Sequence, residues 1–237
     1  AFNAFDLDTI TTLTNDLINL AVDKAVRGIV ISGGGKVFCA GGDLKWAKSW
    51  PDGPTAAFHN LAARYHQAIL EIRRMKKPVI AAINGPAAGG GFSLALACDF
   101  RVMERSALMR QAFTSSGLSI DGAGTFTLPR LVGLAKALEI AAFDQPISAV
   151  QALEWGLVTK VVEDGEARDE ALKMAAELSR RSLHSFGLSK RLLTDSFHHS
   201  LEEHLQHERE SLSSAGGHSD GQEGLTAFVE KRKPVFI

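Results

Sequence analysis

Residues 77–100 read KPVIAAINGPAAGGGFSLALACDF, and this stretch decides the fold. Its first part, residues 78–83, is a short apolar run of the kind that forms a buried strand. Residues 84–86, Asn-Gly-Pro, have the composition of a turn. Three glycines at positions 89–91 then lead into the apolar segment 92–97, which predicts a buried helix.

The glycine run at the start of this expected helix indicates a site for a negatively charged oxygen. Glycine lets a ligand approach the backbone closely. The first N–H groups of a helix have no partner within it, and they lie at the positive end of the helix dipole. Together these features supply half of an oxyanion-binding site. A glycine-rich turn alone is more often only a tight turn, and this one fits neither the dinucleotide nor the P-loop pattern.

A second stretch upstream repeats the pattern. Residues 28–47 read GIVISGGGKVFCAGGDLKWA. Here residues 28–32 predict a strand, and residues 39–43 form a turn of small residues before a helical segment. Two such strand–turn–helix units can each supply one backbone N–H to the same oxygen.

The two stretches resemble signatures of the crotonase superfamily, also called the enoyl-CoA hydratase/isomerase family. The first signature matches residues 38–44 and the second residues 84–99; a third, GLSIDGAGT followed by LPRLVG, matches residues 117–133. Each motif is weak alone, but the three occur in the family's order and cover nearly the whole chain. The resemblance implies an α/β fold, a crotonase-like superhelix of ββα units with a C-terminal helical region.

The chain becomes more polar after Glu163, which suggests two parts. We expect an α/β core over residues 1–162 and a helical region over 163–237, to which the resemblance assigns trimerisation and contact with coenzyme A. Helices are expected in the core over residues 6–23, 54–75, 134–143 and 149–155, and in the tail over 167–180, 185–194, 201–212 and 221–233. Residues 213–217, SSAGG, are expected to break the tail. The family usually has a strand ahead of residue 1, so a preceding segment is expected.

The bulk composition excludes several classes of function. The chain has 237 residues, of which 45% are apolar, so it can bury a sizeable core. Its net charge of −1 leaves no basic excess for nucleic acid or an anionic membrane. No apolar run is long enough for a membrane span. Its two cysteines make no disulfide framework, which favours a reducing, cytoplasmic compartment.

By resemblance, the backbone N–H groups of Ala40 and Gly90 are the two donors to a thioester carbonyl. Asp121 lies in the third motif, where several family members carry an acid/base or nucleophilic Asp, although an Asp beside glycine is usually a solvated loop residue. The resemblance further implies contacts to an acyl-CoA from the first motif and the tail: Ala40, Gly41, Gly42, Asp43, Leu44, Gly90 and Lys231. Coenzyme A is then part of the substrate, with no bound cofactor and no metal, and the expected assembly is a homotrimer or a dimer of trimers.

Two positions depart from the family's hydratases. Those enzymes use two glutamates, whose counterparts here are Ser93 and Phe113. Adding water needs one group to activate it and another to deliver a proton, so a single Asp121 favours moving a double bond through an enolate. The alternatives of a hydratase, lyase, dehalogenase or hydrolase remain open. The hydrolase is included because the segment around Ser93 resembles a degraded nucleophile elbow. A catalytically weak acyl-CoA-binding subunit is the alternative outside enzymes.

Overall fold

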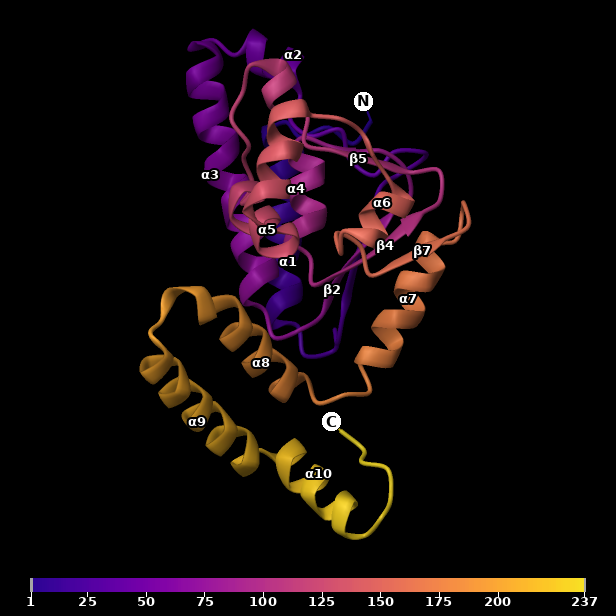
Figure 1. Cartoon of the computed structure of the whole chain (residues 1–237), viewed down its shortest axis with the longest axis vertical. Coiled ribbons are helices and arrows are strands. Elements are labelled where there is room, and N and C mark those ends of the chain that lie inside the picture. The colour runs from indigo at the N-terminus through magenta and orange to yellow at the C-terminus, as the bar shows by residue number, and fades with distance from the viewer. Residues whose placement is uncertain (1, 237) are drawn as a thin grey trace.

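Four parallel strands form the central sheet of the computed structural model, which describes residues 2–236 (Figure 1). In spatial order these strands are β1 (Ile29–Ser32), β2 (Val79–Ile83), β4 (Phe100–Glu104) and β7 (Lys160–Val162). Every residue of β2 is buried, because both faces of the sheet are covered and its apolar run suits that place. β1 and β2 lie where the sequence predicts strands, over residues 28–32 and 78–83.

A second, smaller sheet holds the glycine motifs together. It consists of β3 (Ala87–Ala88), β5 (Leu108–Arg110) and β6 (Ile147–Ser148). β3 pairs in parallel with β5, which pairs antiparallel with β6. Cys39 of the first motif joins Ala87 of the second through an isolated parallel bridge. Two motifs that are distant in the chain are therefore neighbours in space.

Helices surround the two sheets in the core. They are α1 (Leu7–Val22), α2 (Leu44–Ser49), α3 (Gly53–Arg74), α4 (Gly90–Ala97), α5 (Gly124–Phe143) and α6 (Ala149–Glu154), with a 3-10 turn η1 (Thr114–Ser116). α3 begins after Asp52 and carries proline in its first turn, as the sequence predicts. α4 is buried along its whole length, which explains why its sequence is apolar on every side.

The fifth helix begins earlier than the sequence predicts, at Gly124 rather than at residue 134. Its two segments meet at Gly133, whose backbone is not helical (φ 77°, ψ 161°). The predicted helix corresponds to the second segment. The first was missed because it opens with glycine-rich sequence and contains Pro129.

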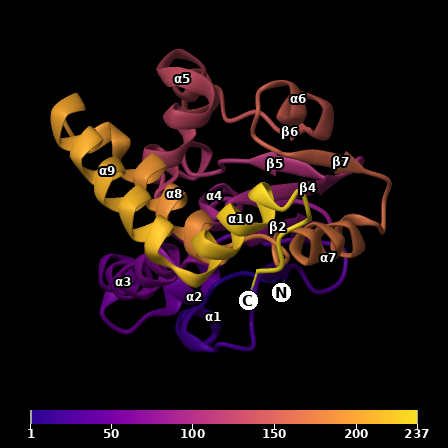
Figure 2. The ribbon, with the colours of Figure 1, turned by 90° about the horizontal axis from the view of Figure 1, so that it is seen from below.

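The tail contains α7 (Ala167–Leu178), α8 (Leu183–Asp195), a 3-10 turn η2 (Ser196–His198), α9 (Leu201–Gly217) and α10 (Ser219–Val229). α7 packs against the central sheet and shares a buried apolar cluster with it. The other three helices form an arm at one end of the molecule (Figures 1 and 2). The division into parts at residue 162 stays a prediction.

One predicted boundary in the arm is wrong. Residues 213–217 do not break the tail, since α9 continues through Gly217. The chain turns at His218 instead, because the ring Nδ1 of this residue accepts a hydrogen bond from the N–H of Asp220 and caps α10. The arm is anchored to the core through Lys190 of α8, whose buried Nζ lies 2.8 Å from Oδ2 of Asp99.

None of the helices formed by residues 2–236 is both long and apolar enough to cross a membrane.

Candidate active site

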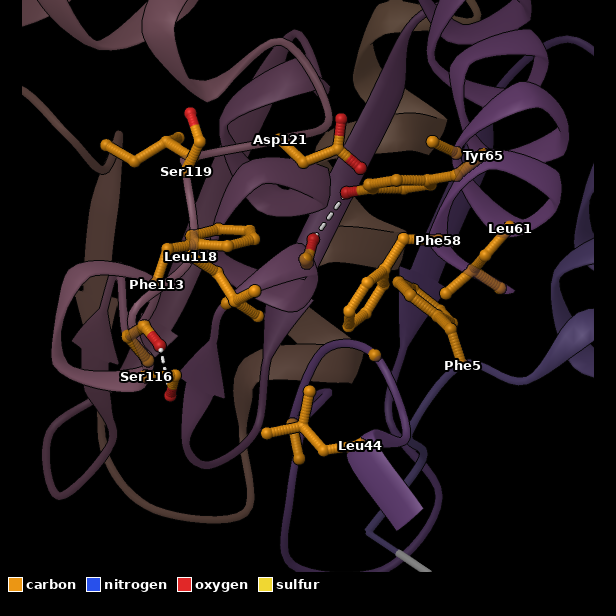
Figure 3. Close-up of a pocket in the computed structure, with 17 residues that line it drawn as sticks. Phe5, Leu44, Phe58, Leu61, Tyr65, Phe113, Ser116, Leu118, Ser119 and Asp121 are labelled. Atoms are coloured by element: carbon orange, nitrogen blue, oxygen red, sulfur yellow. Dashed lines mark hydrogen bonds between the residues drawn. The ribbon is translucent and has the colours of Figure 1, made fainter. Parts of the chain in front are cut away.

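A cavity of about 520 Å³ lies between α3, the start of α4 and residues 112–121 (Figure 3). Its lining is mainly apolar: Phe5, Leu44, Phe58, Leu61, Phe113, Leu118 and Ile120. In Figure 3, Phe113 and Leu118 face the aromatic pair Phe5 and Phe58 across the cavity. Asp121 lies beside Tyr65 at one end, with Leu44 at the other. Such a lining suits an apolar group held in place by few polar atoms.

Gly90 offers one backbone donor to this cavity. It is the first residue of α4 and follows Gly89, whose positive φ of 55° is a backbone conformation that glycine permits. Within residues 2–236, the N–H of Gly90 has no hydrogen-bond partner. Gly90 lines the cavity, so this unpartnered N–H at the positive end of a helix is a candidate donor to a group bound there.

The second expected donor, Ala40, lines the cavity, but its N–H is engaged elsewhere. The N–H of Ala40 donates to the carbonyl of Phe2 at 3.1 Å, so it is not free for a ligand. The N-terminal segment lies alongside the first motif and also engages the carbonyl of Gly41 and the N–H of Asp43, both through Phe5. Gly42 lies between the two residues that Phe5 contacts, Gly41 and Asp43. Its N–H has no partner in the described chain, and Gly42 lines the cavity.

Gly41 brings the two motifs into contact. Its φ is +88°, and a Cβ placed on it would lie 2.8 Å from the backbone nitrogen of Gly90 and 2.9 Å from the carbonyl oxygen of Ala88. Only glycine allows this approach. Gly42 and Gly90, whose N–H groups have no partner in the described chain, thus both line the same cavity. That they act as a pair of donors stays a prediction.

Asp121 also lines the cavity, and it has a partner that the sequence did not reveal. Oδ1 of Asp121 lies 2.6 Å from Nε2 of His66, with the ring N–H donating to the carboxylate. The pair lies at the rim, since the Asp121 side chain is 37% exposed and that of His66 54%. His66 is on α3, four residues after Ala62 of the cavity wall and eight after Phe58. That helical spacing was the one signal that would have found it.

Tyr65 closes the end of the cavity between Gly90 and Asp121. Its ring is buried against Phe5, with ring centroids 5.3 Å apart. Its hydroxyl donates a hydrogen bond to the carbonyl of Gly90 (Figure 3). Burial, with smaller contributions from Cys39 and Asp121, raises the pKa of Tyr65 well above its ordinary value, so the phenol stays protonated.

The two residues at the hydratase glutamate positions have different places. Phe113 forms part of the cavity wall. Ser93 is fully buried inside α4 and does not line the cavity. Among residues 2–236 its Oγ has no hydrogen-bond partner, and it would lie 2.7 Å from a Cβ placed on Gly124. Cys39 is buried too, and burial raises the pKa of its thiol to about 12, so it carries no thiolate at neutral pH.

Asp144 fixes the start of the segment that leads to Phe113 and Asp121. Its buried carboxylate accepts hydrogen bonds from the N–H groups of Ala112 at 2.8 Å and Ser115 at 3.2 Å. Burial acts to raise the pKa of Asp144, but the bonds from these residues and the nearby Arg110 outweigh it and hold the pKa below its ordinary value.

The remaining residues of the expected site divide into three groups. Leu44 lines the cavity, as expected. Asp43 instead caps α2, where its carboxylate accepts from the N–H groups of Lys45 and Trp46. Lys231 follows α10, which lies at the opposite end of the molecule from α2 (Figure 1), and it does not line this cavity. In residues 2–236 no group of three or more His, Cys, Asp or Glu side chains is arranged to hold a metal ion.

Comparison with known proteins shows the same architecture and several chemistries. A model of the family described as enoyl-CoA hydratase/isomerase matches residues 1–237. The chain is 35% identical to a 1,2-epoxyphenylacetyl-CoA isomerase of Escherichia coli over 99% of this chain and 90% of that protein. It is 33% identical to a 4-chlorobenzoyl coenzyme A dehalogenase of an Arthrobacter species, over 97% of this chain and 83% of the other.

A solved structure described as an enoyl-CoA hydratase from a Polaromonas species superposes with a TM-score of 0.93 at 36% identity. That match covers 99% of this chain and 91% of the other. The similar proteins thus carry three names for three reactions, so the reaction has to be argued from the residues of the cavity.

Proposed function

The chain belongs to the enoyl-CoA hydratase/isomerase family, and from that premise we propose that it shifts a double bond in an enoyl-CoA. The thioester oxygen accepts hydrogen bonds from the N–H groups of Gly42 and Gly90. Asp121 removes a proton from the acyl chain, which leaves an enolate, and returns it at another carbon. Coenzyme A serves as the carrier of the substrate, with no separate cofactor.

The observation that carries this proposal is that Asp121 is the only carboxylate lining the cavity in the described chain. Hydration needs a second titratable group beside the reacting carbons, and in the described chain His66 contacts Asp121 but does not line the cavity. Ser93 is buried outside the cavity and Phe113 is apolar. A single carboxylate is sufficient for a proton shuttle, because the same group accepts the proton and delivers it.

The two donors supply the electrostatic part of the reaction. Negative charge develops on the thioester oxygen when the enolate forms, and backbone N–H groups aimed at that oxygen stabilise the charge. The apolar wall excludes water and strengthens these interactions. His66 fixes the orientation of the Asp121 carboxylate through the bond at 2.6 Å.

A defined set of thioesters tests the proposal. The enzyme is incubated with crotonyl-CoA, but-3-enoyl-CoA and 4-phenylbut-3-enoyl-CoA, and the masses of the products are measured by mass spectrometry. Isomerisation of the 3-enoyl substrates leaves the mass unchanged, whereas hydration adds a water. Rapid hydration of crotonyl-CoA without isomerisation of either 3-enoyl thioester would contradict the proposal.

The His66–Asp121 pair favours a second candidate, hydrolytic dehalogenation of an aromatic acyl-CoA. The Asp121 carboxylate would attack the ring carbon that bears the halogen; a C–O bond forms, and halide leaves with the electrons of the C–X bond. His66 would then take a proton from water, and the water oxygen would bond to the ester carbonyl carbon. The acyl C–O bond to the ring oxygen breaks, and the aryloxide leaves and takes the proton from His66. The second proton of the water is released to solvent, which restores the Asp121 carboxylate. The dehalogenase among the similar proteins supports this alternative.

Halide release from 4-chlorobenzoyl-CoA separates the two candidates. Release with formation of 4-hydroxybenzoyl-CoA would establish the second. His66→Gln should then accumulate protein that carries a covalent aryl ester, visible as added mass on the intact chain. With neither halide release nor added mass, the isomerase proposal stands alone.

We also propose a homotrimer or a dimer of trimers. Lys231 follows the arm at the end of the molecule opposite α2 and does not line the cavity of its own chain, so we propose that it contacts the coenzyme A bound to another copy. The arm exposes large apolar side chains that a second chain would cover: Leu193, Phe197, Leu201, Leu205, Leu212 and Phe228. Light scattering coupled to gel filtration tests this, and a monomer at micromolar concentration would contradict it.

A further inference from the structure

Tyr65 is the only tyrosine of the chain. It contacts both the start of α4, at Gly90, and the loop that carries Asp121. Its side chain is buried, with the residue only 3% exposed. On one side its hydroxyl donates to the carbonyl of Gly90, the residue that carries a free backbone donor. On the other side lies the backbone that follows Asp121, at Gly122.

The contact with Gly122 is unusually close. A Cβ on Gly122 would lie 2.2 Å from Cε1 and 2.7 Å from the hydroxyl oxygen of Tyr65, so the loop rests directly on the ring. Gly122 also has a φ of +64°, which suits glycine. The next residue on α3, His66, holds the Asp121 carboxylate at 2.6 Å. One turn of α3 therefore contacts the donor residue, the loop and the carboxylate.

We propose that Tyr65 is a positioning residue that sets the placement of Asp121 relative to the backbone donors at Gly90. The inference rests on the proposed function, in which a carboxylate moves a proton next to a carbonyl held by those donors. Such a reaction is sensitive to misplacement, since an error of about 1 Å costs on the order of 100-fold in rate. A ring held between the two halves fixes their separation, and the hydroxyl bond fixes the ring.

Tyr65 does not itself transfer a proton. Its hydroxyl hydrogen is committed to the Gly90 carbonyl, and burial raises its pKa well above the ordinary value. A general acid or base works best with a pKa near the operating pH. The role of Tyr65 is therefore spatial.

Tyr65→Phe keeps the ring and removes the hydroxyl bond. We expect kcat to fall by about 10- to 100-fold, while the Kd for butyryl-CoA, a saturated thioester, changes by less than about threefold. The infrared stretch of the ¹³C-labelled carbonyl of butyryl-CoA reports on the donors directly, because hydrogen bonds from the donors lower its frequency. The parent should lower this frequency on binding, and Tyr65→Phe should lose part of the shift.

The loop side offers a matched pair of variants. Gly122→Ala forces a Cβ into the Tyr65 ring. Gly117→Ala places an alanine at a similarly strained φ of +70°, where no atom of residues 2–236 outside its chain neighbours lies within 4 Å of the new Cβ. We expect Gly122→Ala to lower kcat at least tenfold more than Gly117→Ala does, with both variants folded by circular dichroism. Equal losses in the two would show that loop strain alone matters and would overturn the inference.

The outcomes separate the inference from the function on which it rests. A parent enzyme that leaves the carbonyl frequency unchanged overturns the proposed function and the inference with it. A parent that shifts the frequency, with Tyr65→Phe equal to it in both shift and kcat, overturns the inference alone. If Tyr65→Phe does not fold, expression with 3-fluorotyrosine labels residue 65 alone. Its single fluorine resonance should then move when butyryl-CoA binds, and an unmoved resonance also counts against the inference.

Discussion

The two walls of the cavity are built in different ways. One, here called the glycine wall, consists of residues 38–44 and 84–91, and it presents backbone N–H groups. The other, the acid wall, consists of residues 112–121 with His66, and it presents a carboxylate. The glycine wall is set by close backbone approach at Gly41, where no side chain fits. The acid wall is set by side-chain contacts between separate elements, through His66 and Asp144.

This difference predicts how substitutions in each wall impair activity. Packed backbone has little freedom to adjust, so a change in the glycine wall acts through the loss of a donor or a clash. A loop held by a few side chains can lose a group while its backbone stays in place. Substitutions chosen in pairs make the comparison measurable.

We expect the largest effect from Asp121→Asn, which removes the acid/base group and keeps the shape of the acid wall. Proton transfer by a positioned side chain contributes about 100- to 10,000-fold, and isomerisation should fall by that factor. Exchange of the acidic protons of butyryl-CoA with deuterated water should fall with it, measured by mass spectrometry. Affinity for butyryl-CoA should stay within about threefold of the parent. An Asn variant that exchanges protons like the parent would show that Asp121 is only a loop residue.

The second largest effect is expected in the glycine wall. Gly90→Pro removes one N–H at the first helical position, which tolerates proline. Gly90→Ala is the matched control, since it keeps the N–H and adds a Cβ that would lie 3.4 Å from the Phe5 ring. Removing one oxyanion donor costs about 100- to 1,000-fold in kcat, so proline should be slower than alanine by that ratio. Equal rates in the two folded variants would remove Gly90 from the oxyanion site.

The sequence predicted the glycine wall well because its pattern is local. A strand, a turn and a glycine run before a helix are all visible within residues 77–100, and Gly90 follows from them. The choice between Ala40 and Gly42 was not visible. It depends on the N-terminal segment that lies alongside the first motif and engages the N–H of Ala40 through the carbonyl of Phe2. That pairing joins residues distant in the chain, and no motif marks it.

The acid wall was predicted only in part for the same reason. Asp121 was found through a resemblance of motifs, but its partner His66 lies on another element and looks like one polar residue on a helix. The arm shows a third case, in which the glycines at 216 and 217 indicated a break. The helix nevertheless continues through them, and the chain turns only at His218, which caps the next helix. Local signals therefore predict that most elements exist, but they predict element boundaries and contacts between elements less well.

A smaller effect is expected from Asp144→Asn, which weakens the support of the acid wall without touching the cavity. Asn tolerates the left-handed backbone at this position, where φ is 49°. Loss of hydrogen bonds to a charged acceptor should lower the free energy of unfolding by about 2 kcal/mol near neutral pH. Turnover should fall less than tenfold, well below the effect of Asp121→Asn.

The pH dependence of this variant follows from the lowered pKa of Asp144 in the folded protein. A lowered folded pKa stabilises the protein above the unfolded pKa of about 3.9, and the contribution is lost as the pH falls through the folded value. The difference in unfolding free energy between the parent and the Asn variant should therefore reach its maximum near pH 7 and should shrink below about pH 4. Urea unfolding at both pH values measures it. A difference that grows in acid would contradict the assignment.

The smallest effect is expected from Ser93→Ala, which tests whether the interior of α4 belongs to the glycine wall. The Oγ of Ser93 is buried and has no hydrogen-bond partner in the part of the chain that the structure describes. An unsatisfied buried hydroxyl costs about 1–3 kcal/mol. Alanine removes that cost but leaves a small void, so the expected gain in unfolding free energy is about 1 kcal/mol. Because Ser93 does not line the cavity, kcat should stay within about twofold. A loss of turnover comparable to that of Gly90→Pro would place the Ser93 hydroxyl in the reaction, and it would return the hydrolase alternative, with Ser93 as nucleophile, to consideration.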